Sequence, residues 1–194
     1  MKEDIPRVPV PVNYGDIITE IQMVQIEVDE IVGKIKSMPE NGKMVEWGSG
    51  GSTCKWLDSI TSLQKLISIE HNENWYNRVS RAVKKHFGEP SNFQYLHIPE
   101  QYGFEHGYAT VTEEHPLGLG PYINPDADIW DADIYLIDGI ARATCAMMVL
   151  LKNTNPNAIV YMHDHEGREI WYDWATQFYN IEQLDLTLAR LHFK

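Results

Sequence analysis

Four short apolar runs of the sequence carry acidic or imidazole side chains at or near their ends. These side chains are, in chain order, Glu46, Glu70, His71, Asp138, His163, Asp164 and His165. Carboxylates and imidazoles can act as general bases, and they also supply oxygen and nitrogen ligands for a divalent cation. Because ligands of open α/β sheets bind at the carboxyl ends of the strands, we expect these side chains to meet in one cleft.

The first of these runs continues into a glycine-rich turn. Residues 43–47 read as a short buried strand, and residues 48–51 (Gly-Ser-Gly-Gly) follow it directly. Glycine has no Cβ, so the backbone of such a turn can pass very close to a ligand. Ser52 and Thr53 supply hydroxyl groups where the next helix should begin. A strand, a glycine-rich turn and a helix N-terminus predict a nucleotide-binding first βα unit.

Two familiar nucleotide sites fit this turn badly. No lysine follows Gly51 before Lys55, as a P-loop requires, and Thr53 stands where a dinucleotide fingerprint needs its third glycine. Instead, Glu46 precedes the turn and Glu70 ends the next apolar run. A carboxylate can accept two hydrogen bonds from a ribose diol, and it favours a positively charged ligand over pyrophosphate. S-adenosylmethionine (SAM), with its sulfonium and α-ammonium groups, has this character and is the expected cofactor.

Composition limits the classes of partner. The 194 residues include 16 basic and 28 acidic side chains, for a formal charge of −12. This balance disfavours nucleic acid and anionic membranes as partners, since both require a basic face. Cys54 and Cys145 form neither a zinc pattern nor a disulfide framework. With no apolar stretch of about 20 residues and no N-terminal signal region, we expect a soluble, cytoplasmic protein of one domain, residues 1–194.

Strands and helices that could position these side chains alternate along the chain. Residues 1–14 contain three prolines and predict an extended arm, and the apolar spacing over residues 15–38 predicts an N-terminal helix capped by Asp16. Expected strands are 43–47, 65–70, 93–96, 132–137 and 158–162, separated by helices and followed by a terminal pair of strands at 181–185 and 187–193. Alternation of this kind implies a parallel sheet. The long loop 97–131 is interpreted as an acceptor-side insertion.

Several of these motifs resemble those of a known family. Glu46-x-Gly48-x-Gly50 followed by Glu70 looks like motifs I and II of the class I SAM-dependent methyltransferases. This resemblance implies an α/β, Rossmann-like fold with helices on both faces of a mostly parallel seven-stranded sheet in the order 3-2-1-4-5-7-6. It also implies a set of cofactor-binding residues, namely Glu46, Gly48, Ser49, Gly50, Ser52, Thr53, Glu70 and His71.

The ordered set of motifs is similar to a narrower group. Ile69-Glu70-His71, Ile137-Asp138-Gly139 with Arg142, and His163-Asp164 resemble signatures of glucuronoxylan O-methyltransferases and, more remotely, of macrolide-sugar O-methyltransferases. This resemblance implies methyl transfer to a hydroxyl of a sugar or glycan. In the metal-dependent O-methyltransferases the positions of Asp138 and Asp164 hold acidic ligands of a divalent metal such as Mg or Mn. Position 163, usually an acid there, is histidine here, so metal dependence stays open.

Roles for these residues follow from the reaction. Methyl transfer to oxygen is an in-line displacement, and a sugar hydroxyl has a pKa far above 7, so a general base or a metal must activate it. Asp138, His163 and Asp164 are the predicted catalytic residues and the predicted metal ligands. Arg142 and His165 are the predicted contacts with the acceptor substrate.

Other functions remain open from the sequence. The acceptor could be a small phenol or an antibiotic-type molecule in place of a sugar. A non-catalytic module with a degenerate SAM site is disfavoured by the intact Glu46, Gly48, Gly50 and Glu70. An NAD(P)-dependent oxidoreductase is disfavoured by Thr53, which replaces the third glycine of the dinucleotide fingerprint.

Overall fold

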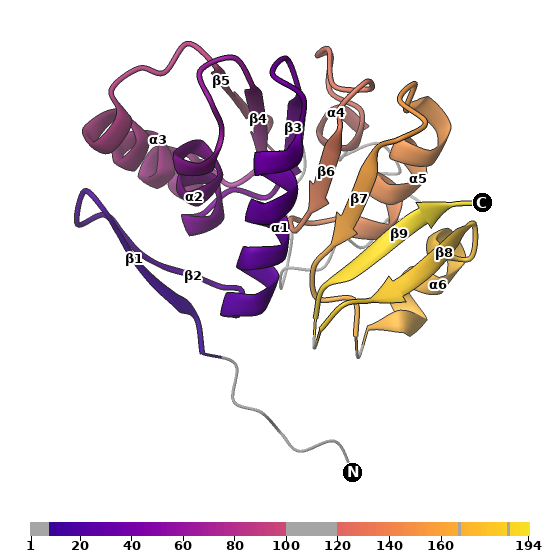
Figure 1. The fold of residues 1–194 in the computed structure, drawn as a ribbon. Coiled ribbons are helices and arrows are strands. Elements are labelled where there is room, and N and C mark those ends of the chain that lie inside the picture. Colours follow the sequence, from indigo (N-terminus) through magenta and orange to yellow (C-terminus); the bar gives the residue numbers. More distant parts are fainter. Residues whose placement is uncertain (1–7, 100–119, 167, 186) are drawn as a thin grey trace.

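The structure, a computed structural model, describes residues 8–99, 120–166, 168–185 and 187–194 (Figure 1). Its helices are α1 (Gln25–Ser37), α2 (Gly51–Ser59), α3 (Glu73–Phe87), α4 (Gly120–Ile123), α5 (Arg142–Lys152) and α6 (Glu169–Thr176). Its strands are β1 (Val10–Tyr14), β2 (Ile18–Ile21), β3 (Lys43–Trp47), β4 (Lys65–Glu70), β5 (Phe93–His97), β6 (Ile134–Ile137), β7 (Ile159–Met162), β8 (Tyr179–Gln183) and β9 (Ala189–Phe193).

Seven strands form one twisted sheet in the order β5-β4-β3-β6-β7-β9-β8. Strands β3 to β7 are parallel, whereas β9 pairs antiparallel with both β7 and β8. Numbered without the separate β1–β2 pair, this order is the predicted 3-2-1-4-5-7-6. The predicted fold class is therefore confirmed, and the structure adds a two-stranded hairpin before it.

Helices cover both faces of the sheet (Figure 1), which is why its parallel strands are apolar on both sides. One core packs α1, α2 and α3 against alternate residues of the strands, such as Met44 and Leu66. The other packs α5 against the intervening residues, such as Val45 and Ile67. Side chains of successive strand residues point to opposite faces, so a single strand contributes to both cores.

The prediction for the N-terminal segment was wrong in part. Residues 10–21 form the β1–β2 hairpin, whose tight turn places Gly15 and Asp16 at φ of 66° and 58°. The helix begins at Gln25 and not near residue 15, so Asp16 is a turn residue and not its cap. Ile18 and Ile21 are nearly fully buried by the hairpin's packing. Residues 1–7 of the predicted arm lie outside the described part.

Most of the predicted acceptor-side insertion, residues 100–119, also lies outside the described residues. The segment from 120 to 131 is described, and it packs into the core. Tyr122 is 1% exposed and Ile129 is fully buried. The indole Nε1 of Trp47 donates a hydrogen bond of 3.0 Å to the carbonyl oxygen of Tyr122. Residues 120–131 therefore pack against β3 on the face of the sheet that carries Trp47.

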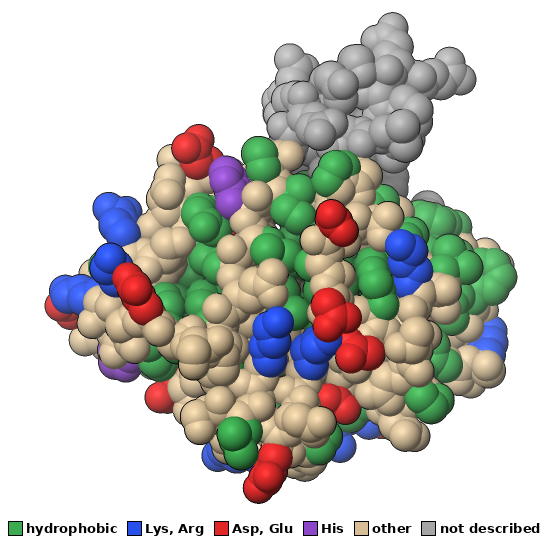
Figure 2. All heavy atoms as spheres, turned by 90° about the horizontal axis from the view of Figure 1, so that it is seen from above, with side chains coloured by type: hydrophobic (Ala, Val, Ile, Leu, Met, Phe, Trp, Pro, Cys, Tyr) green, Lys and Arg blue, Asp and Glu red, His purple; other side chains and the backbone are tan. Residues whose placement is uncertain are grey.

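Figure 2 looks onto the edge of the sheet where the parallel strands begin, and it shows basic and acidic side chains lying close together there. Lys43, the first residue of β3, forms ion pairs with Asp128 and Asp131. The side chains singled out by the sequence lie at the opposite edge, where these strands end. None of the helices in the described ranges has the length and apolar character needed to cross a membrane.

Candidate functional site

A cleft of about 590 Å³ opens at the carboxyl ends of β3, β4, β6 and β7. Its volume lies within the usual range for small-molecule sites. The structure brings ten residues predicted from the sequence to its walls, namely Gly48, Ser49, Gly50, Ser52, Glu70, His71, Asp138, Arg142, His163 and Asp164. The expected convergence of four strand ends is therefore observed. Glu46, Thr53 and His165 are not among the residues that line the cleft.

The glycine-rich turn passes through a narrow gap in the structure. Gly48 has φ of 89°, and a Cβ there would lie 2.5 Å from the backbone nitrogen of Gly139. A Cβ on Gly51 would lie 2.1 Å from the carbonyl oxygen of Glu20. At Gly50, by contrast, no described atom would come within 4 Å of an added Cβ. The turn is therefore held by backbone packing at Gly48 and Gly51, and Gly50 faces open space in the cleft.

Glu46 lies beneath this turn, fully buried. Its carboxylate accepts hydrogen bonds from the hydroxyls of Ser52 (2.8 Å), Thr53 (2.7 Å) and Ser68 (2.9 Å) and from the Trp56 indole (2.9 Å). Burial raises its pKa to about 7, although the hydroxyl donors oppose this shift. The expected contacts of Glu46 and Thr53 with the cofactor are corrected here, because both side chains point away from the cleft and hold the turn from below.

Glu70 lies in the cleft wall and has a different environment. Its Oε2 accepts hydrogen bonds from the backbone nitrogen (2.9 Å) and hydroxyl (2.7 Å) of Ser49. Its Oε1 accepts from the backbone nitrogens of His71 (2.9 Å) and Asn72 (2.8 Å). Burial alone would raise the pKa of Glu70, but the hydrogen bonds outweigh it and the pKa is lowered. The cleft therefore contains an ionised carboxylate directly beside the glycine-rich turn.

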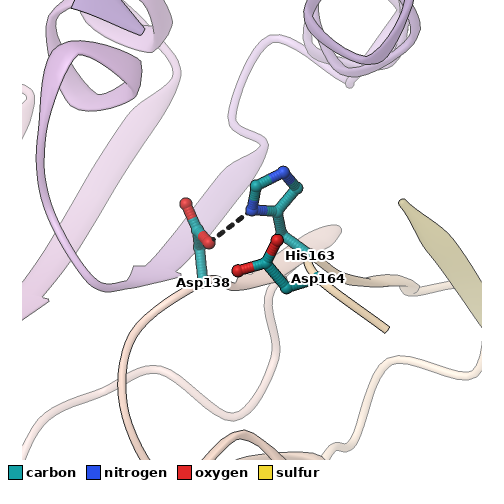
Figure 3. A group of neighbouring side chains, drawn as sticks. All are labelled: Asp138, His163 and Asp164. Atoms are coloured by element: carbon teal, nitrogen blue, oxygen red, sulfur yellow. Dashed lines mark hydrogen bonds and ion pairs between the residues drawn. The ribbon is translucent and has the colours of Figure 1, made fainter. Parts of the chain in front are cut away.

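Asp138, His163 and Asp164 form a cluster whose ligand atoms all lie within 4.8 Å of one another. Figure 3 shows the Asp138 carboxylate facing the ring of His163, with the Asp164 carboxylate beside them. Nδ1 of His163 lies 2.7 Å from Oδ1 of Asp138. Arg142 donates to Oδ2 of Asp164 (3.1 Å) and to the carbonyl oxygen of Asp138 (2.9 Å). The predicted catalytic residues are thus brought together by the ends of β6 and β7.

His163 is a cation in this cluster. Its Nε2 lies 3.5 Å from Oε2 of Glu27, so carboxylates face both ring nitrogens. Burial lowers the pKa of the ring, but Asp138, Glu27 and Asp164 together raise it from 6.5 to about 10. A ring that already holds both protons at neutral pH cannot accept another. The predicted role of His163 as a proton acceptor is not favoured by this raised pKa.

The predicted metal ligands lie together, but the cluster does not fit a divalent cation as it stands. Arg142, with a side chain only 12% exposed, already bridges the carboxylates of Asp138 and Asp164. The ring nitrogens of His163 are directed at the carboxylates of Glu27 and Asp138, so neither nitrogen can reach a metal ion unless the ring moves. We therefore derive no step through a metal ion.

Some residues of the cleft were not foreseen, and His165 is, with Glu46 and Thr53, one of three foreseen residues that do not line it. Glu27 of α1, Thr187 of the β8–β9 turn and Arg168 line the cleft, and no motif in the sequence marks them. His165 is 4% exposed and lies away from the cleft, with its ring 6.0 Å from that of Tyr172. Its expected contact with the acceptor is corrected, because the turn after Asp164 directs it into the protein.

We expect the charge on His163 to make stability depend on pH. Folding raises the pKa of the ring from 6.5 to about 10, so its stabilisation is complete below about pH 6.5 and disappears as the pH rises through 10. Urea unfolding of the wild type and His163→Gln, measured between about pH 6 and 10.5, should give a stability difference that shrinks over this interval. A difference independent of pH would contradict the assignment of the ring as an imidazolium.

The sheet order is that of a Rossmann-like methyltransferase fold. No family model and no curated protein matches the sequence. Solved structures do match. A methyltransferase-like protein from Silicibacter pomeroyi is 17% identical, with a TM-score of 0.72 over 92% of this chain and 90% of that chain.

Two further structural matches carry more specific names. A putative caffeoyl-CoA O-methyltransferase from Staphylococcus aureus is 14% identical (TM-score 0.60; 88% of this chain, 84% of that chain). A SAM-dependent O-methyltransferase from Thermotoga maritima is 9% identical (TM-score 0.58; 89% and 66%). At these identities the similarity concerns the fold.

Proposed function

We propose that this protein is a SAM-dependent O-methyltransferase that methylates a hydroxyl of a sugar or glycan. The observation that carries the proposal is the arrangement of Glu70, Gly50 and Asp138 around one cleft at the strand ends. The ionised carboxylate of Glu70, the open backbone at Gly50 and the carboxylate of Asp138 all line this cleft. The first carboxylate suits the ribose of SAM, the open glycine backbone leaves room for the nucleoside, and the second carboxylate suits an acceptor hydroxyl.

Three residues would hold the cofactor. Glu70 would accept hydrogen bonds from the ribose hydroxyls, and the backbone at Ser49 and Gly50 leaves room for the ligand, since nothing described lies within 4 Å of a Cβ built on Gly50. When bound, SAM supplies an electrophilic methyl group with the thioether as leaving group. The fixed turn at Gly48 keeps this part of the cleft next to Gly139, and so next to Asp138.

Asp138 would activate the acceptor. Its Oδ1 is held by His163 and Arg142, while no described residue donates a hydrogen bond to its Oδ2. An acceptor hydroxyl beside Oδ2 can transfer its proton to this oxygen as the new carbon–oxygen bond forms. His163 and Arg142 hold the carboxylate in place, because both contact its Oδ1.

The outer walls of the cleft support a hydroxyl-rich acceptor. Thr19, Glu20, Gln22, Arg78 and Arg168 line them and offer both hydrogen-bond donors and acceptors. Trp75 also lines the cleft and is 37% exposed, so it presents an aromatic surface at the rim. A sugar needs many polar partners and an apolar platform, whereas a phenol would need a mainly apolar wall.

Calorimetry with SAM tests the cofactor assignment. The wild type should bind SAM, and Glu70→Ala should weaken binding roughly 10- to 100-fold, because it removes a charged acceptor for the ribose. Glu73→Ala, the exposed neighbour at the start of α3, should leave affinity unchanged. Equal affinity of the Glu70 variant, or no binding to the wild type, would reject the site.

A methylation screen tests the activity. Monosaccharides and simple glycosides would be incubated with SAM, in the presence of Mg²⁺ or Mn²⁺ and, separately, of a chelator. We expect methylated product from at least one sugar in both conditions. Methylation of phenols but not of any sugar would replace the proposed acceptor class.

A further inference from the structure

We propose that Glu27 is a positioning residue that aligns the base Asp138 through the ring of His163. This inference rests on the proposed function, in which Asp138 accepts the acceptor proton. Glu27, at the start of α1, His163 and Asp138 form a continuous carboxylate–imidazole–carboxylate chain along the wall of the cleft. Glu27 lies 111 positions before Asp138 in the sequence, so no local motif contains the pair.

Glu27 is fixed from two directions. Its Oε2 accepts a hydrogen bond of 3.1 Å from the backbone nitrogen of Val24, at the start of α1. Its Oε1 accepts from the hydroxyl and, at 3.3 Å, from the backbone nitrogen of Thr187 in the β8–β9 turn. The residue is 1% exposed, so these bonds are shielded from water. Elements from opposite ends of the chain therefore set the position of one carboxylate.

The ring of His163 links Glu27 to Asp138. Its ring is 5% exposed and spans the two carboxylates, with Nε2 3.5 Å from Glu27 and Nδ1 2.7 Å from Asp138. Because the ring is held at one end by Glu27, its other nitrogen fixes Oδ1 of Asp138. The remaining oxygen of Asp138 is then left for the acceptor, as in catalytic dyads whose base is oriented by a third group.

A role in capping α1 explains only part of this arrangement. A cap needs one acceptor for a backbone N–H, which an uncharged side chain can supply. A buried carboxylate is costly unless it is paired, and the charged partner available to Glu27 here is the ring that reaches the cleft. The ion pair with His163 therefore explains why a charged side chain stands at position 27. The cap of α1 explains only the hydrogen bond from the backbone nitrogen of Val24.

Replacement of Glu27 by Gln separates these roles, because glutamine keeps the length of the side chain and an acceptor for Val24. We expect kcat to fall roughly 10- to 100-fold, with the Kd for SAM and the KM for the acceptor within about twofold of the wild type. Glu30→Gln is the matched control. Glu30 lies nearly one turn further along α1, pairs with Arg190 and lies outside the cleft, and its variant should keep the wild-type kcat.

A double-mutant cycle adds a readout that a merely structural role would not move. If Glu27 acts through His163, then His163→Asn combined with Glu27→Gln should lower kcat no further than the worse single variant. A double variant whose kcat falls by the product of the two single-variant factors would overturn the proposal. A folded Glu27→Gln protein with the wild-type kcat would also overturn it. Loss of thermal stability in step with kcat across all variants would also count against it.

A crystal structure of Glu27→Gln keeps the test independent of any acceptor. The ring of His163 should turn from its place between the two carboxylates, so that Nδ1 no longer lies at the wild-type distance of 2.7 Å from Oδ1 of Asp138. An unmoved ring would refute the role of Glu27 even without turnover, whereas a moved ring in a protein that methylates nothing would refute only the proposed function.

Discussion

Replacement of Asp138 by Asn should lower kcat by about 10²- to 10⁴-fold, or roughly 3–5 kcal/mol of transition-state stabilisation. Asparagine has nearly the same shape and can still accept a hydrogen bond from Nδ1 of His163, which lies 2.7 Å from Oδ1. It cannot accept a proton from the acceptor hydroxyl at neutral pH. Steady-state methylation assays with the acceptor found in the screen would measure the loss.

The affinity for SAM separates this role from a role in binding. Calorimetry on Asp138→Asn should give a Kd close to that of the wild type, since Glu70 and the glycine-rich turn are unchanged. Asp126→Asn, an exposed aspartate that does not line the cleft, serves as the matched control for both measurements. A variant that loses SAM binding while bound SAM still reacts at the normal rate would show that Asp138 belongs to the cofactor site.

Replacement of Gly48 by Ala should destabilise the protein by about 2–5 kcal/mol and abolish SAM binding. The residue has φ of 89°, which alanine adopts only at a cost. Its new methyl group would also lie 2.5 Å from the nitrogen and 2.6 Å from the Cα of Gly139. Both are backbone atoms, so no side chain can move aside. Urea unfolding monitored by tryptophan fluorescence would measure the change.

Gly50→Ala is the matched control in the same turn. Gly50 has φ of 177°, which any residue adopts, and a Cβ there meets no described atom within 4 Å. Its stability should therefore stay within about 0.5 kcal/mol of the wild type. Its methyl group would enter the cleft, so SAM affinity should fall. Equal stability of the two variants would mean that Gly48 and Gly139 do not pack as described.

The main sheet could be predicted from the sequence because each of its strands is a short apolar run next to a turn or a helix. The hairpin could not, because Ile17 and Ile21 are four residues apart, a spacing that fits a helix as well. Gly15 and Asp16 have positive φ values, which fit a tight turn and not a right-handed helix. Burial of Ile18 and Ile21 then favours the strand, and this depends on contacts with distant parts of the chain.

The types of residue in the site could be predicted from the sequence, but the directions in which their side chains point could not. Glu46 stands at the end of an apolar strand as expected, yet its carboxylate is directed at Ser52, Thr53, Trp56 and Ser68. Strand alternation allows either face, and the donors on α2 and on the neighbouring strand β4 select one. Glu27 and Thr187, 160 positions apart, meet only because the last strand pair folds back beside α1.

Beside the buried side chains of Ile18 and Ile21, main-chain carbonyl groups hold the hairpin that lines the cleft on the rest of the protein. Arg78 donates to the carbonyl oxygen of Ile17, at 3.1 and 3.0 Å, and Lys85 donates to that of Gly15 at 2.7 Å. Gly51 packs against the carbonyl oxygen of Glu20. Carbonyl groups are common to all residues, so exposed side chains such as Thr19, Glu20 and Gln22 can be exchanged without unseating the wall. If the proposed function holds, substitutions at these exposed positions can change the acceptor preference while the residues proposed to bind SAM stay the same.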